Sequence, residues 1–186
     1  MSSIRSFIAV DLPHEIKMDI DRLTSGFRGD GSGIRWVKAA NVHLTLRFLG
    51  DIPQESVPRL AASLREKLGG FGSFDVALSG MGGFPDLRKP RVIWIGTGEG
   101  TERLSLLAEK VESSCIESGF GKGDKKFSSH LTVGRVKFPK GLESLLDKIG
   151  HTEFRSPKFT VSEVLVVRSD LSSAGPKYTK LESVLL

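Results

Sequence analysis

Two copies of one short pattern stand out among the residues that can transfer protons. Residues 43–46 read His-Leu-Thr-Leu, and residues 130–133 read His-Leu-Thr-Val. In an extended strand, side chains two residues apart share a face, so each copy predicts a His beside a Thr with apolar residues behind them. An imidazole, whose unperturbed pKa is about 6.5, can donate or accept a proton near neutral pH. Two such strands across one cleft would supply an acid and a base.

The pairing favours catalysis, although a single strand histidine is more often a surface or core residue. A threonine hydroxyl beside each imidazole can donate a hydrogen bond to a phosphate oxygen. Zinc sites usually need three or four protein ligands, and no compact cluster of His, Cys, Asp or Glu surrounds either copy. His14 and His151 have no Thr partner and are expected at the surface. The sequence therefore predicts metal-independent acid–base chemistry.

Composition narrows the class of protein. A chain of 186 residues suits one domain, and Cys115, the single cysteine, cannot form an internal disulfide, which agrees with a reducing compartment. The apolar run 7–10 is too short for a secretory signal, and no segment reaches the roughly 20 apolar residues of a spanning helix. We expect a soluble, cytoplasmic protein. The net charge of +5 favours an anionic partner such as nucleic acid.

Hydrophobic spacing predicts the elements that would position the histidines. The strand 43–49 should carry His43, Thr45 and Arg47 on one face, opposite Leu44, Leu46 and Phe48. Glycine and proline predict loops at 26–33, 80–89 and 172–176, and the basic segment 121–126 is expected to lie beside the site as a mobile loop. Other strands are expected at 5–12, 34–37, 74–78, 91–97, 159–168 and 178–185, and helices from Pro13, Pro53, Thr101 and Gly141.

The order of these elements alternates strands with helices, which would suit parallel α/β units. The polar and apolar faces of the histidine strands favour antiparallel sheets with one exposed face, so the expected class is α+β. The recurring pattern also suggests two similar halves.

The chain resembles the 2H phosphoesterases, and specifically the bacterial and archaeal RNA 2′,3′-cyclic phosphodiesterases, also called 2′-5′ RNA ligases. The resemblance covers nearly the whole chain, although Ser129 stands where the family usually has Pro. Besides the two His-x-Thr-x motifs, it is carried by segments 5–9, 12–13, 43–50, 83–85, 90–96, 130–135 and 175–178.

This resemblance implies a bilobal fold in which two antiparallel sheets face a central cleft and helices pack outside. It implies one domain over residues 1–186, made of two pseudo-symmetric lobes. It assigns His43 as the proton donor and His130 as the proton acceptor, with Thr45, Thr132 and Arg135 binding the phosphate and no metal or cofactor taking part.

Two side chains raise conflicts with strict alternation along the strands. Arg135 would lie on the face opposite His130, unless the strand bulges or the guanidinium reaches the phosphate from the edge. Phe7 and Phe48 are candidates for stacking on a base, yet alternation with Leu44 would place Phe48 in the core.

The implied substrate is RNA ending in a 2′,3′-cyclic phosphate, hydrolysed by a monomer to a 2′-phosphate. Reverse 2′-5′ joining of tRNA halves would need no ATP, and the chain has no Gly-x-x-x-x-Gly-Lys-Ser/Thr loop. One alternative is a cyclic phosphodiesterase acting on small nucleotides. Another is a non-catalytic RNA-binding module, which leaves the paired motifs as coincidence.

Overall fold

The computed structural model describes residues 2–29, 33–173 and 175–186. It confirms the α+β class with antiparallel strands. The helices are α1 (His14–Ser25), α2 (Val57–Leu68), α3 (Thr101–Glu117) and α4 (Glu143–Gly150), with short 3-10 turns η1 (Ala39–Asn41) and η2 (Gln54–Ser56). The strands are β1 (Ser3–Val10), β2 (Ile34–Trp36), β3 (Leu44–Pro53), β4 (Phe74–Val76), β5 (Leu78–Phe84), β6 (Val92–Thr97), β7 (His130–Val136), β8 (Phe159–Val161), β9 (Glu163–Ser172) and β10 (Gly175–Leu185).

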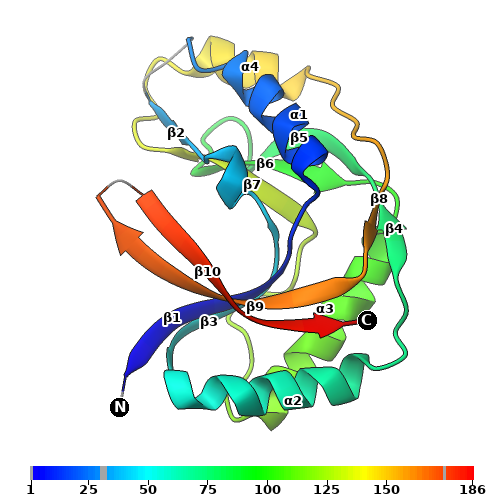
Figure 1. Ribbon diagram of the computed structural model, residues 1–186. Coiled ribbons are helices and arrows are strands. Elements are labelled where there is room, and N and C mark those ends of the chain that lie inside the picture. The colour runs from blue at the N-terminus through cyan, green and yellow to red at the C-terminus, as the bar shows by residue number, and fades with distance from the viewer. Residues whose placement is uncertain (1, 30–32, 174) are drawn as a thin grey trace.

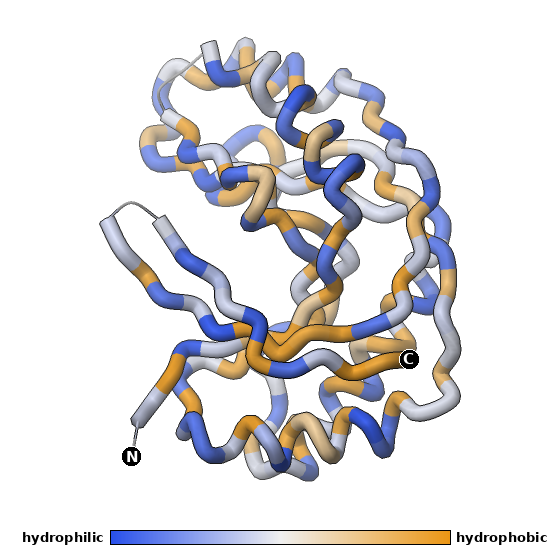
Figure 2. Tube along the Cα trace, in the orientation of Figure 1, coloured by the Kyte–Doolittle hydropathy of each residue, from blue (hydrophilic) through white to orange (hydrophobic). Residues whose placement is uncertain are grey.

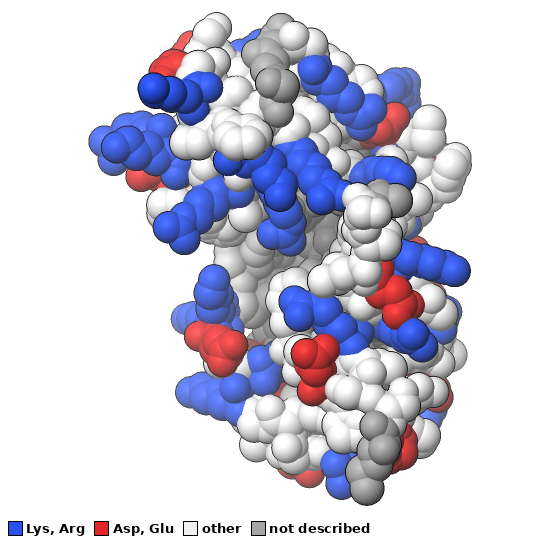
Figure 3. All heavy atoms as spheres, turned by 90° about the vertical axis from the view of Figure 1, so that its left-hand side faces the viewer, with Lys and Arg blue, Asp and Glu red and all other residues white. Residues whose placement is uncertain are grey.

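The main sheet consists of two antiparallel halves that meet at one point. Its strand order is β10-β9-β1-β3-β7-β6-β5, with β2 also paired to β7, while β4 and β8 form a separate two-stranded sheet. Between β3 and β7, both of which the structure describes in full, only one Cα pair is in register, Leu44 with Leu131. The two halves diverge from this pair (Figure 1), and the space-filling view shows a hollow between them (Figure 3).

Helices cover the outer side of both halves. Helices α2 and α3 pack together, with α3 against β3, while α4 packs against β5 and lies near α1 (Figure 1). One half of the sheet takes strands from both ends of the chain, since β1 and β3 stand beside β9 and β10, while the other half is built from β2, β5, β6 and β7. The spatial halves are therefore interleaved in sequence.

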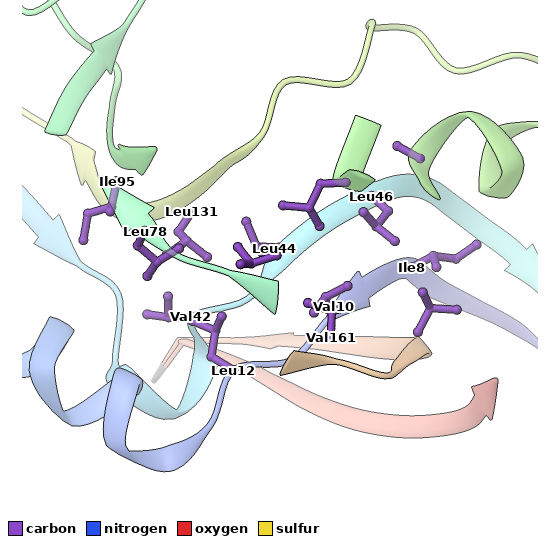
Figure 4. Close-up of a cluster of buried hydrophobic side chains, with 14 of the residues drawn as sticks. Ile8, Val10, Leu12, Val42, Leu44, Leu46, Leu78, Ile95, Leu131 and Val161 are labelled. Carbon is purple, nitrogen blue, oxygen red and sulfur yellow. The ribbon is translucent and has the colours of Figure 1, made fainter. Parts of the chain in front are cut away.

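The core lies behind the junction of the two halves. Leu44 and Leu131 are fully buried, and Leu78 and Ile95 close around them (Figure 4). Along α2 and the other helices, hydrophobic residues alternate with hydrophilic ones, so one stripe faces the sheet (Figure 2). The apolar side of the first histidine strand thus holds it against its counterpart.

Two expectations for local structure are wrong. Residues 80–84 belong to β5 and do not form a loop, because their glycines make room for an indole: a Cβ on Gly82 would lie 2.2 Å from Cζ2 of Trp94. Pro53 ends β3 and does not open the helix, which begins at Val57. The expected glycine loop at 26–33 and the turn at 172–176 lie partly outside the described residues, at 30–32 and 174.

Candidate active site

Both histidines are oriented by the backbone two residues before them. His43 directly precedes β3, and its Nδ1 lies 2.8 Å from the carbonyl oxygen of Asn41. His130 begins β7, and its Nδ1 lies 2.7 Å from the carbonyl oxygen of Ser128. A carbonyl oxygen only accepts hydrogen bonds, so each Nδ1 is the donor and carries hydrogen. In the neutral ring, Nε2 is then the nitrogen with a free lone pair.

The single pair between β3 and β7 brings the two motifs together. Leu44 and Leu131 point into the core, so the residues on either side of each leucine point to the opposite face. In an antiparallel pair this sets His43 toward Thr132 and Thr45 toward His130. Neither threonine hydroxyl makes a hydrogen bond with the described part of the protein, and both side chains are half-buried. Two imidazoles and two available hydroxyls therefore share one face.

A β-bulge in β3 lies at the last residue of the first motif. Thr45 pairs with Ala9 and Arg47 pairs with Ile8, although Ala9 and Ile8 are adjacent, so Leu46 has no partner. The extra residue reverses the side-chain alternation that follows. The expectation that Arg47 shares a face with the histidine is therefore wrong, as is the expectation that Phe48 is a core residue: Phe48 is 59% exposed.

A second bulge in β7 lies at the equivalent residue of the second motif. Thr132 pairs with Trp94 and Gly134 pairs with Ile93, which leaves Val133 without a partner. The reversal moves Arg135 onto the face of His130 and Thr132. This resolves the conflict posed by simple alternation. The fifth residue after each histidine, Phe48 in one strand and Arg135 in the other, is brought to the face of the site by the same device.

Aromatic rings surround His43. The Phe7 ring stacks on the imidazole with centroids 4.6 Å apart, and Tyr178 meets it edge-on at 5.2 Å. Phe7 is only 3% exposed, so it supports the imidazole and has no free face for a base. Phe48 lies beside Phe7 at 5.9 Å and keeps its exposed ring. Of the two candidates for base stacking, only Phe48 is accessible.

His130 has a smaller aromatic neighbourhood. Phe84 meets its ring edge-on at 4.8 Å, and Trp94 lies 5.5 Å from Phe84. At Ser129, where the resembling family usually has Pro, the hydroxyl accepts a hydrogen bond from Thr97 Oγ1 at 2.7 Å. This hydrogen bond connects the residue before β7 to the end of β6, so Ser129 is held in place through its hydroxyl.

Burial lowers the pKa of both histidines. For His43 desolvation is the main cause, and the charges of Lys17 and Arg135 act in the same direction, while the Asn41 carbonyl and the Asp11 carboxylate oppose it. For His130 desolvation outweighs the opposing hydrogen bond to the Ser128 carbonyl. Each ring therefore favours its neutral form more than a solvated imidazole does.

Burial also raises the pKa of Tyr178, against the opposing charges of Arg135 and Arg5, so the phenol stays protonated and can donate a hydrogen bond.

The basic loop before β7 is anchored on the side of β3 away from the histidines. Arg47 Nε lies 2.8 Å from Glu112 Oε2 of α3, and its Nη2 donates to the carbonyl of Gly121. Glu112 in turn accepts a hydrogen bond from the amide of Gly123 at 2.6 Å. The expectation that residues 121–126 lie beside the site is therefore not met at Gly121 and Gly123.

Positive charge gathers at the hollow between the two halves of the sheet. Figure 3 shows Lys and Arg side chains grouped along its upper edge, with few acidic groups among them. Within the described ranges, no group of three or more His, Cys, Asp or Glu is placed to hold a metal ion. No described helix is long and apolar enough to cross a membrane.

Sequence reasoning missed several residues of this site. Tyr178 and Phe84 come from strands distant in sequence, and the orienting carbonyls of Asn41 and Ser128 belong to residues whose types carry no signal. Tyr178, the single tyrosine of the chain, and Phe84 both lie in segments that supported the family resemblance, and this was the available hint.

Known proteins resemble this chain over its whole length. RNA 2′,3′-cyclic phosphodiesterase of Methanothermobacter thermautotrophicus is 33% identical, with 96% of this chain and 97% of that protein aligned. The enzyme of the same name from Thermotoga maritima is 34% identical, with 96% and 93% aligned. The crystal structure of E. coli LigT complexed with 3′-AMP superposes with a TM-score of 0.79 at 26% identity, covering 100% of this chain and 99% of that one.

One family model matches the chain twice in succession. The model for LigT-like phosphoesterases covers residues 10–94 and again residues 95–178, and each match contains one His-x-Thr-x motif. Together with the curated relatives, the two matches show that the chain belongs to the LigT-like phosphoesterase family.

Proposed function

We propose that the protein is an RNA 2′,3′-cyclic phosphodiesterase that produces a 2′-phosphate by two-histidine acid–base catalysis. The observation that supports this most is the matched presentation of the imidazoles. Each has Nδ1 bound to a backbone carbonyl, which leaves Nε2 to exchange a proton on a face shared with two available threonine hydroxyls. The names of the relatives supply the substrate.

The reaction needs one proton taken and one given. His130 Nε2, neutral at the start, accepts a proton from water as the water oxygen attacks phosphorus. The bond between phosphorus and the 3′ oxygen breaks, and protonated His43 donates its Nε2 proton to that leaving oxygen. The product carries a 2′-phosphate and a free 3′-hydroxyl, and both histidines have exchanged protonation states. The direction of transfer follows the resembling family.

The remaining residues stabilise the charge on the phosphoryl oxygens. Thr45 and Thr132 donate hydrogen bonds, and Arg135 supplies a cation on the same face. These groups perform the electrostatic work for which other phosphoesterases use a metal ion, and no ligand cluster for one is present among the described residues. In the proposed reaction these groups stabilise the charge, and no metal or cofactor takes part.

Phe48 is positioned to hold the terminal base. Its ring is the most exposed of the aromatic group formed with Phe7, His43 and Tyr178. Base stacking on an aromatic side chain contributes about 1–3 kcal/mol and tolerates any base. A ring in this place would fix the terminal nucleoside beside His43.

The same site would also join RNA when a 5′-hydroxyl takes the place of water. The 5′ oxygen attacks phosphorus and gives its proton to His130, the bond between phosphorus and the 3′ oxygen breaks, and His43 protonates that oxygen, which leaves a 2′-5′ phosphodiester without use of ATP. This extends the proposal to 2′-5′ ligation of tRNA halves by a cytoplasmic monomer. The consecutive family matches, each with one motif, support one domain with two pseudo-symmetric lobes.

The decisive experiment uses an RNA that ends in a 2′,3′-cyclic phosphate. Incubated with the protein and EDTA, it should yield a 2′-phosphate end, identified by mass spectrometry and by resistance to enzymes that need a free 2′-hydroxyl. Loss of turnover in EDTA with rescue by a divalent ion would overturn the metal-independent mechanism. Cleavage of cyclic mononucleotides alone would favour the small-nucleotide alternative, and binding of RNA without cleavage would favour a non-catalytic module.

A further inference from the structure

A second arginine stands beside Arg135 without a role in the reaction described above. Arg35 lies in β2, and its Cα is in register with that of Arg135 in β7. Residues directly opposite in an antiparallel pair project to the same face of the sheet. Because the bulge at Val133 brings Arg135 to the face of the histidines, Arg35 shares that face one strand further from them.

Two like charges directly opposite each other destabilise a sheet, so their presence needs a compensating partner. The protein supplies none: in the described part of the chain neither guanidinium has an ion pair or a hydrogen bond, and both side chains are exposed. Many other arginines of the fold are paired, such as Arg47 with Glu112 and Arg65 with Glu182. The arrangement fits a ligand with more than one negative charge.

Arg35 reaches from one half of the sheet toward the other. A Cβ built on Gly175, the first residue of β10, would lie 3.3 Å from Nη2 of Arg35. The guanidinium therefore reaches from β2 toward the strand that also carries Tyr178. The charge of Arg135, in contrast, acts on both His43 and Tyr178. Arg135 therefore lies nearer the reacting atoms, and Arg35 lies farther from them on the same face.

We infer that Arg35 binds the phosphodiester one nucleotide upstream of the terminal cyclic phosphate and so makes the enzyme prefer oligonucleotide ends to cyclic mononucleotides. A cyclic mononucleotide has one phosphate, which Arg135 and the threonines engage, and it leaves Arg35 without an anion. An RNA chain brings a second phosphate at the next nucleotide. The planar guanidinium fork suits a phosphodiester, which offers two oxygens for paired hydrogen bonds. This inference rests on the proposed function.

The test compares two substrates in wild type and in Arg35→Ala. One substrate is a cyclic mononucleotide and the other a tetranucleotide with the same terminal nucleoside 2′,3′-cyclic phosphate. The ratio of their kcat/KM values should favour the tetranucleotide in wild type, and it should fall about tenfold in the variant, mostly through KM. For the tetranucleotide, the slope of log KM against log salt should decrease by about 0.7, the value for one phosphate contact on a single strand.

Two further variants sharpen this comparison. Arg35→Lys keeps the charge and should keep the salt slope while losing part of the affinity. Arg22→Ala removes one charge from the exposed surface of α1, where Arg22 pairs with Asp19, and should leave both the ratio and the slope as in wild type.

The possible failures are distinguishable. Wild-type turnover of both substrates with no preference for the tetranucleotide, or a preference ratio that Arg35→Ala leaves unchanged, would overturn the assignment of Arg35 and leave the proposed function standing. If the salt slope falls equally in Arg22→Ala, the effect of Arg35 comes from the net charge of the protein and not from a phosphate contact, and the assignment is also overturned. No turnover of either substrate by wild type would overturn the proposed function and this inference together.

Discussion

The two histidine strands share their backbone and differ in what they offer the ligand. In each, Nδ1 is held by the carbonyl two residues earlier, a bulge follows the threonine, and the fifth residue after the histidine turns to the cleft. That residue is Phe48 in β3 and Arg135 in β7. Under the proposed function, the difference teaches that one backbone arrangement, used twice, can serve two parts of one ligand: an aromatic ring for the base and a cation for the phosphate.

The largest effect should come from what the two strands have in common. Changing His43 or His130 to Ala should lower kcat by roughly 10²- to 10⁴-fold, the usual range for general acid or base catalysis. The double variant should lose much less than the product of the single losses, because the two groups act as a unit. Single-turnover rates measure this, with circular dichroism to check folding.

His151→Ala is the matched control, since it removes an imidazole that is 80% exposed and far in sequence from both motifs. It should turn over at the normal rate. If either site variant does so as well, the equivalence of the two strands fails.

The next largest effects should differ between the two histidine strands. Arg135→Ala should lower kcat/KM by about 10- to 100-fold, as expected for loss of a charge-assisted hydrogen bond, and Phe48→Ala by about tenfold, as expected for loss of one stacked base. Repeating both assays with an abasic terminal ribose should abolish the effect of Phe48→Ala and preserve that of Arg135→Ala. Equal sensitivity of the two variants to removal of the base would refute the division of labour between them.

Smaller and matched losses are expected from the threonines. Thr45→Ala and Thr132→Ala each remove one neutral hydrogen-bond donor, which should cost about two- to tenfold in kcat/KM. Thr45→Ser and Thr132→Ser retain the hydroxyl and should recover most of the rate. Were the serine variants as impaired as the alanine variants, the methyl group and its packing would be the relevant feature.

The smallest effect is a displacement of the pH profile. One imidazole must be neutral and the other charged, so kcat/KM should follow a bell shape that reports the free enzyme. Because burial lowers the pKa of both histidines, both limbs should lie below pH 6.5, the unperturbed value. Rates measured in constant ionic strength across the acidic range test this, and an optimum above that pH would contradict it.

Much of the fold was predictable because the spacing of apolar residues in the sequence matches the buried faces of the strands and helices. Leu44 and Leu131 were expected on the apolar side of their strands, and they form the single point where the halves of the sheet join. The amphipathic stripe that ends in Leu64 and Leu68 likewise identified α2. Each of these features depends on residues that are close together in the sequence, so the periodicity and composition of a single segment reveal it.

The bulges could not be predicted in the same way. Leu46 and Val133 are apolar and buried, so both fit an uninterrupted alternation as well as they fit a bulge. The partner strand decides between the two, and pairing partners are distant in sequence. For the same reason the faces of Arg47 and Phe48 were assigned incorrectly. The glycines of β5 were mistaken for a loop because the indole that needs their space is carried by another strand.

The carbonyl groups behind the two imidazoles have a consequence for mutational robustness. Every residue type has a backbone carbonyl, so Asn41 and Ser128 can be replaced by other residues without removing the acceptor that orients each ring. An enzyme that orients its histidine with a carboxylate side chain loses that acceptor in one substitution. Here the tautomer of the two histidines is protected from point mutation at Asn41 and Ser128, and only a change in the path of the backbone can disturb it.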